Sequence, residues 1–401
     1  MNTLKDEKRL VRFTYIFCLL GFFALSLLKT PIDKEAYVMG VITCILFGYS
    51  YFVIRRFFPD GDKFIFIFVG ILSIIGIMTL YGIKMPSSIK QMIWFAVGVT
   101  IYILIVILLP DLKSFMKYKN TYLILTLLFM SMTIIFGTEK NGSKNWIVFY
   151  GFMVQPSEFG KIFLCAYLAS ALKDYKEHKD LLIPAIVVMV SLLFMVFQKD
   201  LGTALILFGI SVTMLYIATA KLKYILVCFV LFGIGSVISY QLFDHVRLRI
   251  MIWRNPWLYA SDKSLQIVQS MFSIASGGLF GVGLGQGHPE FVPVSQTDFI
   301  FPVICEEMGI LMGFAIIIIY FLLFYRCMRA AFYVEDKFSR LLAVGLSAMT
   351  ACQVIVIIGG VTNMIPLTGI TMPFISYGGS SMVISFISLG IIQKISEDWS
   401  W

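Results

Sequence analysis

An aspartate at the edge of an apolar run is the residue best placed for proton transfer in this chain. Asp298 lies within the stretch Gln296–Phe301, directly before a long apolar run and beside aromatic side chains. Partial loss of hydration at such a position raises the pKa of a carboxyl group and makes it a better base. The sequence therefore predicts a general base at Asp298, with a helix N-cap as the alternative role.

A second carboxylate, Glu158, stands three residues before Lys161 at the start of another apolar run. Residues three apart lie on one side of a helix, so these two side chains can pair. An ionisable pair at membrane depth is by default a candidate functional site. The alternatives are an ion pair that only fixes packing, and a Lys161 side chain that reaches to the membrane surface.

Asp200 stands between two apolar runs that are separated by almost no loop. An aspartate there can cap the second run by accepting hydrogen bonds from the free N–H groups of a helix start. Capping is at least as plausible as catalysis. A carboxylate at a helix start can also orient a cationic neighbour, so the two roles are compatible.

Three arginines, Arg247, Arg249 and Arg254, surround the apolar stretch 250–253. A basic and aromatic stretch of this kind predicts an interfacial helix that touches lipid head groups. Planar guanidinium groups also suit a diphosphate. Composition favours the membrane-surface role, and the diphosphate role stays open.

The glycine-rich segment Gly277–Gly287 fits neither common nucleotide-binding spacing. We predict a flexible or tightly turning backbone that moves over a substrate. The three histidines are scattered, and the sequence has no zinc-protease motif, no serine nucleophile elbow and no phosphate-binding loop. These absences count against zinc hydrolysis, serine hydrolysis and ATP-driven transport.

The elements that must position these residues are membrane-spanning helices. Of the 401 residues, 59% are hydrophobic and only 14% are charged, which leaves too few polar side chains to cover a water-soluble globule. A bilayer core about 30 Å thick needs roughly 20 apolar helical residues. Twelve runs approach that length: Leu10–Leu28, Tyr37–Ile54, Phe64–Ile83, Met92–Leu109, Tyr122–Phe136, Glu158–Leu172, Leu181–Phe197, Leu201–Ala218, Tyr224–Leu242, Val303–Tyr325, Leu341–Gly359 and Met382–Gln393.

The distribution of positive charge predicts the orientation of these runs. With a cytoplasmic amino terminus, 20 of the 32 Lys and Arg residues fall on the inner side and 11 on the outer side. Both termini are therefore expected in the cytoplasm. The net charge of +9 then serves orientation and attraction to anionic membrane lipids, so we expect no nucleic-acid partner. Four polar connections lie on the outer side: 137–157, 198–200, 243–301 and 361–381. Because loops often carry functional residues, these connections predict an active site on the external face.

Eight short motifs in register resemble the SEDS family (RodA/FtsW/SpoVE-like) of bacterial shape, elongation, division and sporulation proteins. The motifs cover about residues 64–394: Gly142–Ile147, Gln155–Lys161, Asp200–Thr203, Gln266–Ser270, Ser276–Gly278, Thr297–Phe301, Glu306–Gly309 and Pro373–Ser381. The chain departs from the family pattern at a few positions. Basic residues are usual at the positions of Lys144 and Asn145, proline at that of Lys199, and glutamate at that of Val294.

The resemblance implies an all-α fold, a polytopic transmembrane helix bundle with a ten-span core. The first family span aligns with Phe64–Ile83, which leaves residues 1–60 as an extra N-terminal transmembrane hairpin and gives about twelve spans. Residues 61–401 would form the catalytic membrane domain, with a large extracytoplasmic loop at 243–301. The seven cysteines fall one at a time in or beside apolar runs, and their spacing indicates neither a disulfide framework nor a zinc site.

The resemblance also implies a peptidoglycan glycosyltransferase that polymerises lipid II with inversion and releases undecaprenyl diphosphate. In such a reaction Asp298 would be the catalytic base, or would hold a divalent metal ion such as Mg or Mn. Developing charge on the diphosphate calls for cations. The residues implied in substrate binding are Lys161, Arg247, Arg249 and Arg254 at the diphosphate, Glu158 and Asp200 as orienting groups, and Gln269 and Ser376 at sugar or diphosphate oxygens.

Family membership further implies the bacterial cytoplasmic membrane as location and a class B penicillin-binding protein, a transpeptidase, as partner. Two rival functions remain at this point. A flippase or transporter of a lipid-linked cell-wall precursor would use the same cations for binding alone, and a non-catalytic scaffold would only activate the transpeptidase. The motifs do not distinguish roles in division, elongation and sporulation.

Overall fold

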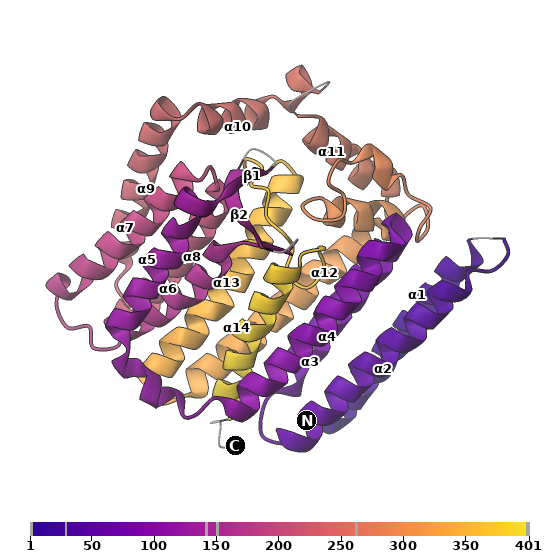
Figure 1. Cartoon of the computed structure of the whole chain (residues 1–401), viewed down its shortest axis with the longest axis horizontal. Coiled ribbons are helices and arrows are strands. Elements are labelled where there is room, and N and C mark those ends of the chain that lie inside the picture. The colour runs from indigo at the N-terminus through magenta and orange to yellow at the C-terminus, as the bar shows by residue number, and fades with distance from the viewer. Residues whose placement is uncertain (1–2, 29, 141–142, 150–151, 261–263, 398–401) are drawn as a thin grey trace. The chain divides into compact units, whose positions relative to one another are not determined.

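The computed structural model describes residues 3–28, 30–140, 143–149, 152–260 and 264–397. Gly142, the first residue of one family-like motif, lies outside these ranges. The chain divides into two compact units, and helices dominate both (Figure 1). The first unit comprises residues 1–107, 260–326 and 371–401, and the second comprises residues 108–259 and 327–370.

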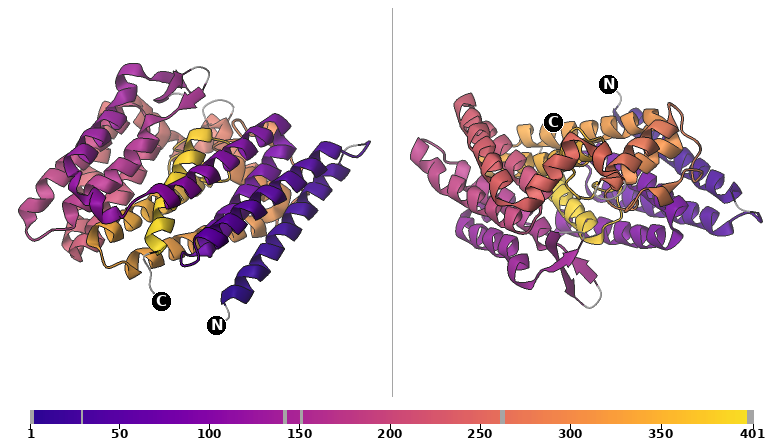
Figure 2. Two further views of the ribbon diagram at one scale, coloured as in Figure 1. Left: turned by 60° about the horizontal axis from the view of Figure 1, so that its bottom comes forward. Right: turned by 90° about the horizontal axis from the view of Figure 1, so that it is seen from above.

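The first unit is built around α3 (Lys63–Ile83), most of which is buried. The amino-terminal helices α1 (Thr3–Leu27) and α2 (Lys34–Phe57) pack against each other and against α3 (Figures 1 and 2). Phe47 of α2 is fully buried and stacks on Phe66 of α3, so the hairpin shares the core of this unit. The remaining elements are α4 (Met85–Leu108), α11 (Leu265–Gly277), η4 (Pro289–Phe291), α14 (Gly379–Glu397) and the first part of α12 (Ile300–Tyr333).

The second unit is built around α6 (Pro156–Leu172) and α13 (Lys337–Val361), which pack together. Helix α5 (Lys119–Phe136) covers α6, and α8 (Leu201–Thr219) packs on both central helices. Helix α9 (Leu222–Leu242) has no buried residue, which suits a helix surrounded by lipid. The remaining elements are η1 (Leu112–Lys117), η2 (His178–Leu181), α7 (Leu182–Phe197), α10 (Asp244–Arg254), η3 (Pro256–Tyr259) and a small β-sheet.

Aspartates begin several of the long helices. The side chains of Asp33, Asp62, Asp200 and Asp336 accept hydrogen bonds from backbone N–H groups at the starts of α2, α3, α8 and α13. Each satisfies donors that a helix start leaves without an internal partner. Helix α6 begins instead with Pro156, whose missing N–H costs nothing in the first turn.

The prediction of an all-α polytopic bundle is confirmed. Every one of the twelve predicted apolar runs lies on a helix, and eleven helices within the described ranges are long and apolar enough to cross a membrane. The twelfth, α6, has 17 residues and falls just short. The division into residues 1–60 and 61–401 stays a prediction.

One feature of the fold was not predicted. Within the outer connection 137–157, the strands β1 (Thr138–Lys140), β2 (Ser143–Phe149) and β3 (Phe152–Val154) form an antiparallel sheet in the order β1-β2-β3. Ile147 pairs with Val154 in this sheet, and Trp146 pairs with Thr138. The aromatic and β-branched run 146–148 favours a strand, but it is too short to stand out among the apolar helices.

Candidate functional site

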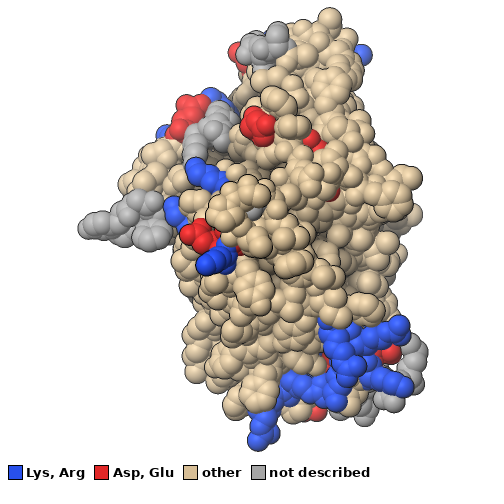
Figure 3. Space-filling view, turned by 90° about the vertical axis from the view of Figure 1, so that its right-hand side faces the viewer, with Lys and Arg blue, Asp and Glu red and all other residues tan. Residues whose placement is uncertain are grey.

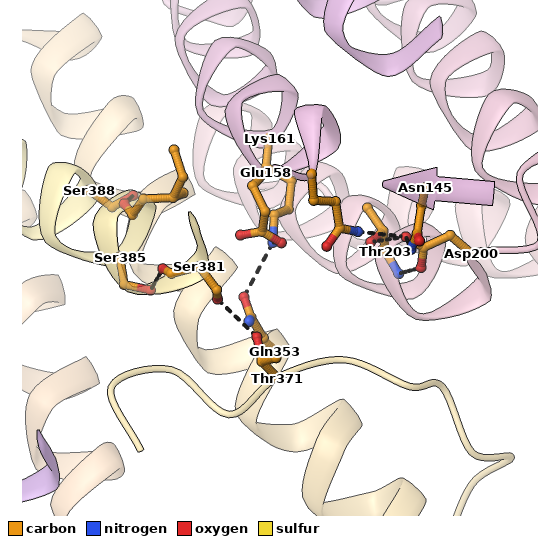
Figure 4. A network of polar contacts seen from close by, with 12 residues as sticks. Asn145, Glu158, Lys161, Asp200, Thr203, Gln353, Thr371, Ser381, Ser385 and Ser388 are labelled. Carbon is orange, nitrogen blue, oxygen red and sulfur yellow. Dashed lines mark hydrogen bonds and ion pairs between the residues drawn. The ribbon is translucent and has the colours of Figure 1, made fainter. Parts of the chain in front are cut away.

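Asp200 is the centre of a buried polar cluster in the second unit (Figure 4). Its Oδ1 atom accepts from the backbone N–H of Thr203 at 3.0 Å, and this bond caps α8. Its Oδ2 atom accepts from three side chains: Asn145 at 2.9 Å, Gln155 at 3.0 Å and the hydroxyl of Thr203 at 2.9 Å. Only 3% of Asp200 is exposed. The cap expected from the sequence is therefore present, and the same carboxylate ties β2 and the start of α6 to α8.

Glu158 and Lys161 form a second buried cluster on α6, also drawn in Figure 4. The Nζ atom of Lys161 lies 2.7 Å from Oε1 of Glu158 and donates to Oε1 of Gln353 on α13 at 3.3 Å. Lys161 is fully buried, so its side chain does not reach to the membrane surface. Removing two charges from water is costly, and close pairing offsets that cost. The predicted pair exists, and it also joins α6 to α13.

The three arginines of α10 have different surroundings. The guanidinium of Arg249 is half-buried and donates to the backbone carbonyls of Leu367 at 3.1 Å and of Lys199 at 3.4 Å. Arg247 is exposed, and its Nη1 atom lies 3.6 Å from Oδ1 of Asp244. Arg254 is also exposed and lies seven residues after Arg247, so both occupy one face of the helix. The helix thus presents Arg247 and Arg254 outward and uses Arg249 to hold neighbouring loops.

A histidine on the same helix has a perturbed pKa. Partial burial lowers the pKa of His245 below its usual value, and the nearby positive charges of Arg249 and Lys199 lower it further. His245 is therefore neutral at pH 7. Its Nε2 atom is buried and makes no hydrogen bond to the described part of the chain.

Asp298 lies in the first unit, in a turn two residues before α12 begins at Ile300. The residue directly before the helix is Phe299, so Asp298 does not occupy the N-cap position. Its side chain is half-buried, whereas Phe299 and Ile300 are fully buried. The carboxylate is therefore partly accessible to water, and its role as a general base stays a prediction.

Two connections fix the turn that carries Asp298. The hydroxyl of Ser376 donates to the carbonyl of Thr297 at 2.6 Å, and the N–H of Tyr377 donates to the carbonyl of Gln296 at 2.9 Å. Helix α4 contacts one residue from each side of these connections. Ser87 donates to the side chain of Gln296 at 2.7 Å, and Gln91 donates to the carbonyl of Ser376 at 2.9 Å. The predicted residue Ser376 thus holds the backbone directly before Asp298.

Gln269 lies on α11 in the same unit and is half-buried. One turn later, the hydroxyl of Ser273 donates to the carboxylate of Glu306 on α12. The same carboxylate accepts from the backbone N–H of His288 at 3.1 Å. Glu306 therefore joins α11, α12 and the loop between them, which positions Gln269 relative to the helix that follows Asp298.

The described residues provide no protein cage for a metal ion. No group of three or more His, Cys, Asp and Glu side chains lies together within them. Among the described residues, Asp298 is thus the one predicted ligand for Mg or Mn, and the metal stays a prediction.

Several residues of these clusters were not predicted as site residues from the sequence. They are Asn145, Gln155 and Gln353 in the second unit and Ser87 and Gln91 in the first. The available signal is an amide side chain inside or beside an apolar run, as for Gln353. Such a side chain must find a partner when buried, but the sequence does not identify which one.

The fold and these clusters define a multi-pass membrane protein with buried ionic groups beside the starts of its helices. The chain belongs to the FtsW/RodA/SpoVE family of cell cycle proteins, whose model matches residues 62–400. The resemblance inferred from the eight motifs is thereby confirmed.

Curated relatives match most of the chain. The peptidoglycan glycosyltransferase RodA of Mycobacterium tuberculosis (strain H37Rv) is 36% identical over 398 residues, which cover 92% of this chain and 84% of that protein. The stage V sporulation protein E of Bacillus subtilis is 33% identical over 318 residues, which cover 77% of this chain and 86% of that protein.

Two solved structures share the fold. A chain of a peptidoglycan synthase complex matches with a TM-score of 0.73 and 23% identity, covering 84% of this chain and 98% of that one. The rod shape determining protein RodA of Thermus thermophilus matches with a TM-score of 0.64 and 24% identity, covering 85% of this chain and 98% of that one.

Proposed function

We propose that this protein is a peptidoglycan glycosyltransferase that polymerises lipid II into glycan strands. Relatives named as peptidoglycan glycosyltransferases that match over nine-tenths of the chain support this function. The observation that carries the proposal is the half-buried Asp298, which follows a turn that Ser376 and Tyr377 hold through the carbonyls of Thr297 and Gln296.

In the proposed reaction, a sugar hydroxyl of one lipid-linked chain attacks the anomeric carbon of another. The bond between that carbon and the diphosphate breaks, and the configuration at the carbon inverts. Asp298 takes the hydroxyl proton as the new glycosidic bond forms. Undecaprenyl diphosphate leaves with the electron pair of the broken bond.

The diphosphate gains negative charge as it leaves, and cations stabilise it. Among the predicted cations, Arg247 and Arg254 have exposed side chains that can contact a ligand. Lys161 is fully buried and bonded to Glu158 and Gln353, so its contribution would be to the local field and to helix packing. Asp200 would act in the same indirect way, through the segments that it ties together.

We place the protein in the bacterial cytoplasmic membrane with both termini in the cytoplasm. On the face drawn in Figure 3, Lys and Arg side chains gather at one end, beside a broad uncharged area. Exposed cations mark the start of α1 and the end of α2: Lys5, Lys8, Arg9, Arg12 and Arg56. This bias supports a cytoplasmic location for that end of the hairpin and contact with anionic lipids.

A class B penicillin-binding protein is the proposed partner, because glycan strands need a transpeptidase to cross-link them. The resemblance of the fold to a chain of a peptidoglycan synthase complex agrees with such an assembly. Division, elongation and sporulation remain equally compatible roles.

The test gives the purified protein fluorescent lipid II, with and without the transpeptidase, and separates the products on a gel. We expect glycan ladders from the wild type and from Asp111→Asn, a control at the exposed cap of η1. We expect none from Asp298→Ala. Movement of lipid II across the bilayer without ladders would support the flippase, and the absence of both ladders and movement would support the scaffold.

A further inference from the structure

Helix α12 is interrupted at Gly309, and the glycine-rich segment Gly277–Gly287 supplies hydrogen-bond partners for the backbone groups that the interruption leaves free. Gly309 has a φ of 82°, which removes two helical bonds: those from the amides of residues 310 and 311 to the carbonyls of residues 306 and 307. The amides of Ile310 and Leu311 donate instead to the carbonyls of Gly278 and Leu279, at 2.9 and 3.4 Å. The carbonyls of Glu306 and Glu307 accept from the amides of Val282 and Gly283, at 2.9 and 3.0 Å.

Close approach of the two backbones requires glycine on both sides. A Cβ atom on Gly309 would lie 2.2 Å from the carbonyl oxygen of Leu279. A Cβ atom on Gly281 would lie 2.2 Å from the carbonyl oxygen of Glu307, and one on Gly277 would lie 2.1 Å from that of Cys305. The segment is therefore docked on α12. Positive φ angles at Gly278, Gly281, Gly283 and Gly285 agree with the tightly turning backbone, one of the two predicted alternatives. Movement of the segment over a substrate stays a prediction.

Helix α3 sets the depth of this segment in the membrane. It runs from Lys63 to Ile83, and Lys84 follows it, so its length matches a bilayer core of about 30 Å. Each end of α3 lies beside one residue of α12, so the two helices can be compared in depth along the membrane normal. Asp62, which caps α3, accepts from Arg326 at 3.1 Å, and a Cβ atom on Gly82 would lie 3.7 Å from the carboxylate of Glu307. Helix α12 therefore enters the bilayer core near Glu307 and leaves it near Arg326.

The docked segment reaches below this entry point. Its residues Gly278 and Leu279 bond to Ile310 and Leu311, and Leu311 lies four residues past Glu307. Four helical residues correspond to about 6 Å. The chain then turns back to the level of Gly82, since a Cβ atom on Gly82 would lie 3.3 Å from the Cα atom of Gly285.

The tip of the segment is apolar and exposed. Phe280 is 80% exposed, Leu279 is 60% exposed and Val282 is 45% exposed. In water, three neighbouring side chains of this kind would be an unfavourable surface. Irregular backbone can exist at membrane depth where protein satisfies its polar groups, as α12 does here.

We propose that residues 277–287 form a re-entrant loop that enters the bilayer beside α12 and presents Leu279, Phe280 and Val282 to lipid acyl chains. The occupant is hydrocarbon because the tip lies below the level at which α3 and α12 enter the core. Depth, exposure and backbone bonds place the loop there, whatever reaction the protein performs. Through Glu306, the loop also fixes α11 to α12.

The test measures thiol accessibility in lipid nanodiscs, where both membrane faces contact the reagent. The three half-buried native cysteines, Cys44, Cys228 and Cys352, are first replaced by alanine. Phe280→Cys is compared with Phe291→Cys, a matched control that is 60% exposed and lies in η4 beside the exposed His288 and Glu290. A charged, water-soluble maleimide is added, and labelling is normalised to that after denaturation in detergent.

We expect Phe280→Cys to react at least tenfold more slowly than Phe291→Cys, although its side chain is the more exposed. A nitroxide attached at position 280 should be relaxed more by oxygen, which enters lipid, than by a water-soluble nickel complex. Leu279→Cys repeats the measurement if the first variant does not fold. Equal labelling rates at positions 280 and 291, or stronger relaxation by nickel at position 280, would overturn the proposal.

Discussion

Asp200 and Asp298 occupy similar places in the sequence, each directly before an apolar run, yet their surroundings differ. Asp200 accepts four hydrogen bonds and is almost fully buried. Asp298 is half-buried, and its position is fixed by bonds to the backbone of the two preceding residues. A carboxylate that is almost fully buried among its donors serves structure, whereas a half-buried carboxylate stays accessible to water and can exchange a proton.

The same contrast separates the two clusters of the second unit from the turn in the first. Lys161, Glu158 and Asp200 are bonded in ways that make their removal costly to the fold. Substitutions in that group should therefore lower stability, and substitutions around Asp298 should mainly lower activity.

The largest expected effect on stability is that of Lys161→Met. This change leaves Glu158 buried without its cation, which costs about 3–5 kcal/mol of unfolding free energy. Thermal unfolding in detergent measures the loss. The double variant Lys161→Met, Glu158→Leu should recover most of it, because no buried charge is left. A single variant as stable as the wild type would show that the pair does not hold α6.

Asp200→Ala should cost about 2–3 kcal/mol, because it removes a helix cap and leaves buried donors without an acceptor. Asp336→Ala is the matched control, since Asp336 caps α13 through Ser339 but is only half-buried. The control should lose about 1 kcal/mol. Equal losses in the two variants would mean that the bonds from Asn145 and Gln155 add nothing to the cap.

Ser376→Ala tests how firmly the turn before Asp298 is held. The change removes the bond to the Thr297 carbonyl and should cost about 1 kcal/mol of stability. We expect kcat for glycan synthesis to fall several-fold with little change in KM, because the base is positioned less well. A rise in KM at constant kcat would instead favour the direct substrate contact predicted for this hydroxyl.

The smallest effect concerns pH. The pKa of His245 is lower in the folded protein than in the unfolded chain, so the unfolded state binds more protons below about pH 6.5. Stability should therefore fall as the pH drops below that value, and less so in His245→Gln. Melting temperatures of both proteins between pH 5 and pH 8 measure the difference. Parallel curves would contradict a role for this histidine.

The helices and the candidate residues could be predicted because they depend on the length of apolar runs and on the spacing of residues close in sequence. Glu158 and Lys161 are three residues apart, and the cap at Asp200 involves its own helix. The donors Asn145 and Gln155 precede Asp200 by 55 and 45 residues, so folding alone brings them together.

The glycine-rich segment shows the opposite limit. A high glycine content indicates either a flexible backbone or a backbone that packs closely against another segment, and the sequence does not show which segment packs against it. Here the partner is a broken helix, and its signal is one glycine, Gly309, inside a long apolar run. The short β-sheet was missed for a related reason, because its strands pair across connections that the sequence presents only as a polar loop.

The most direct test of the central claim is the initial rate of lipid II polymerisation by Asp298→Asn, measured beside its melting temperature. Asparagine keeps the size of the side chain but cannot take a proton. We predict a rate at least about 100-fold below that of the wild type, with an unchanged melting temperature. A variant that polymerises lipid II at the wild-type rate would contradict the assignment of Asp298 as the base.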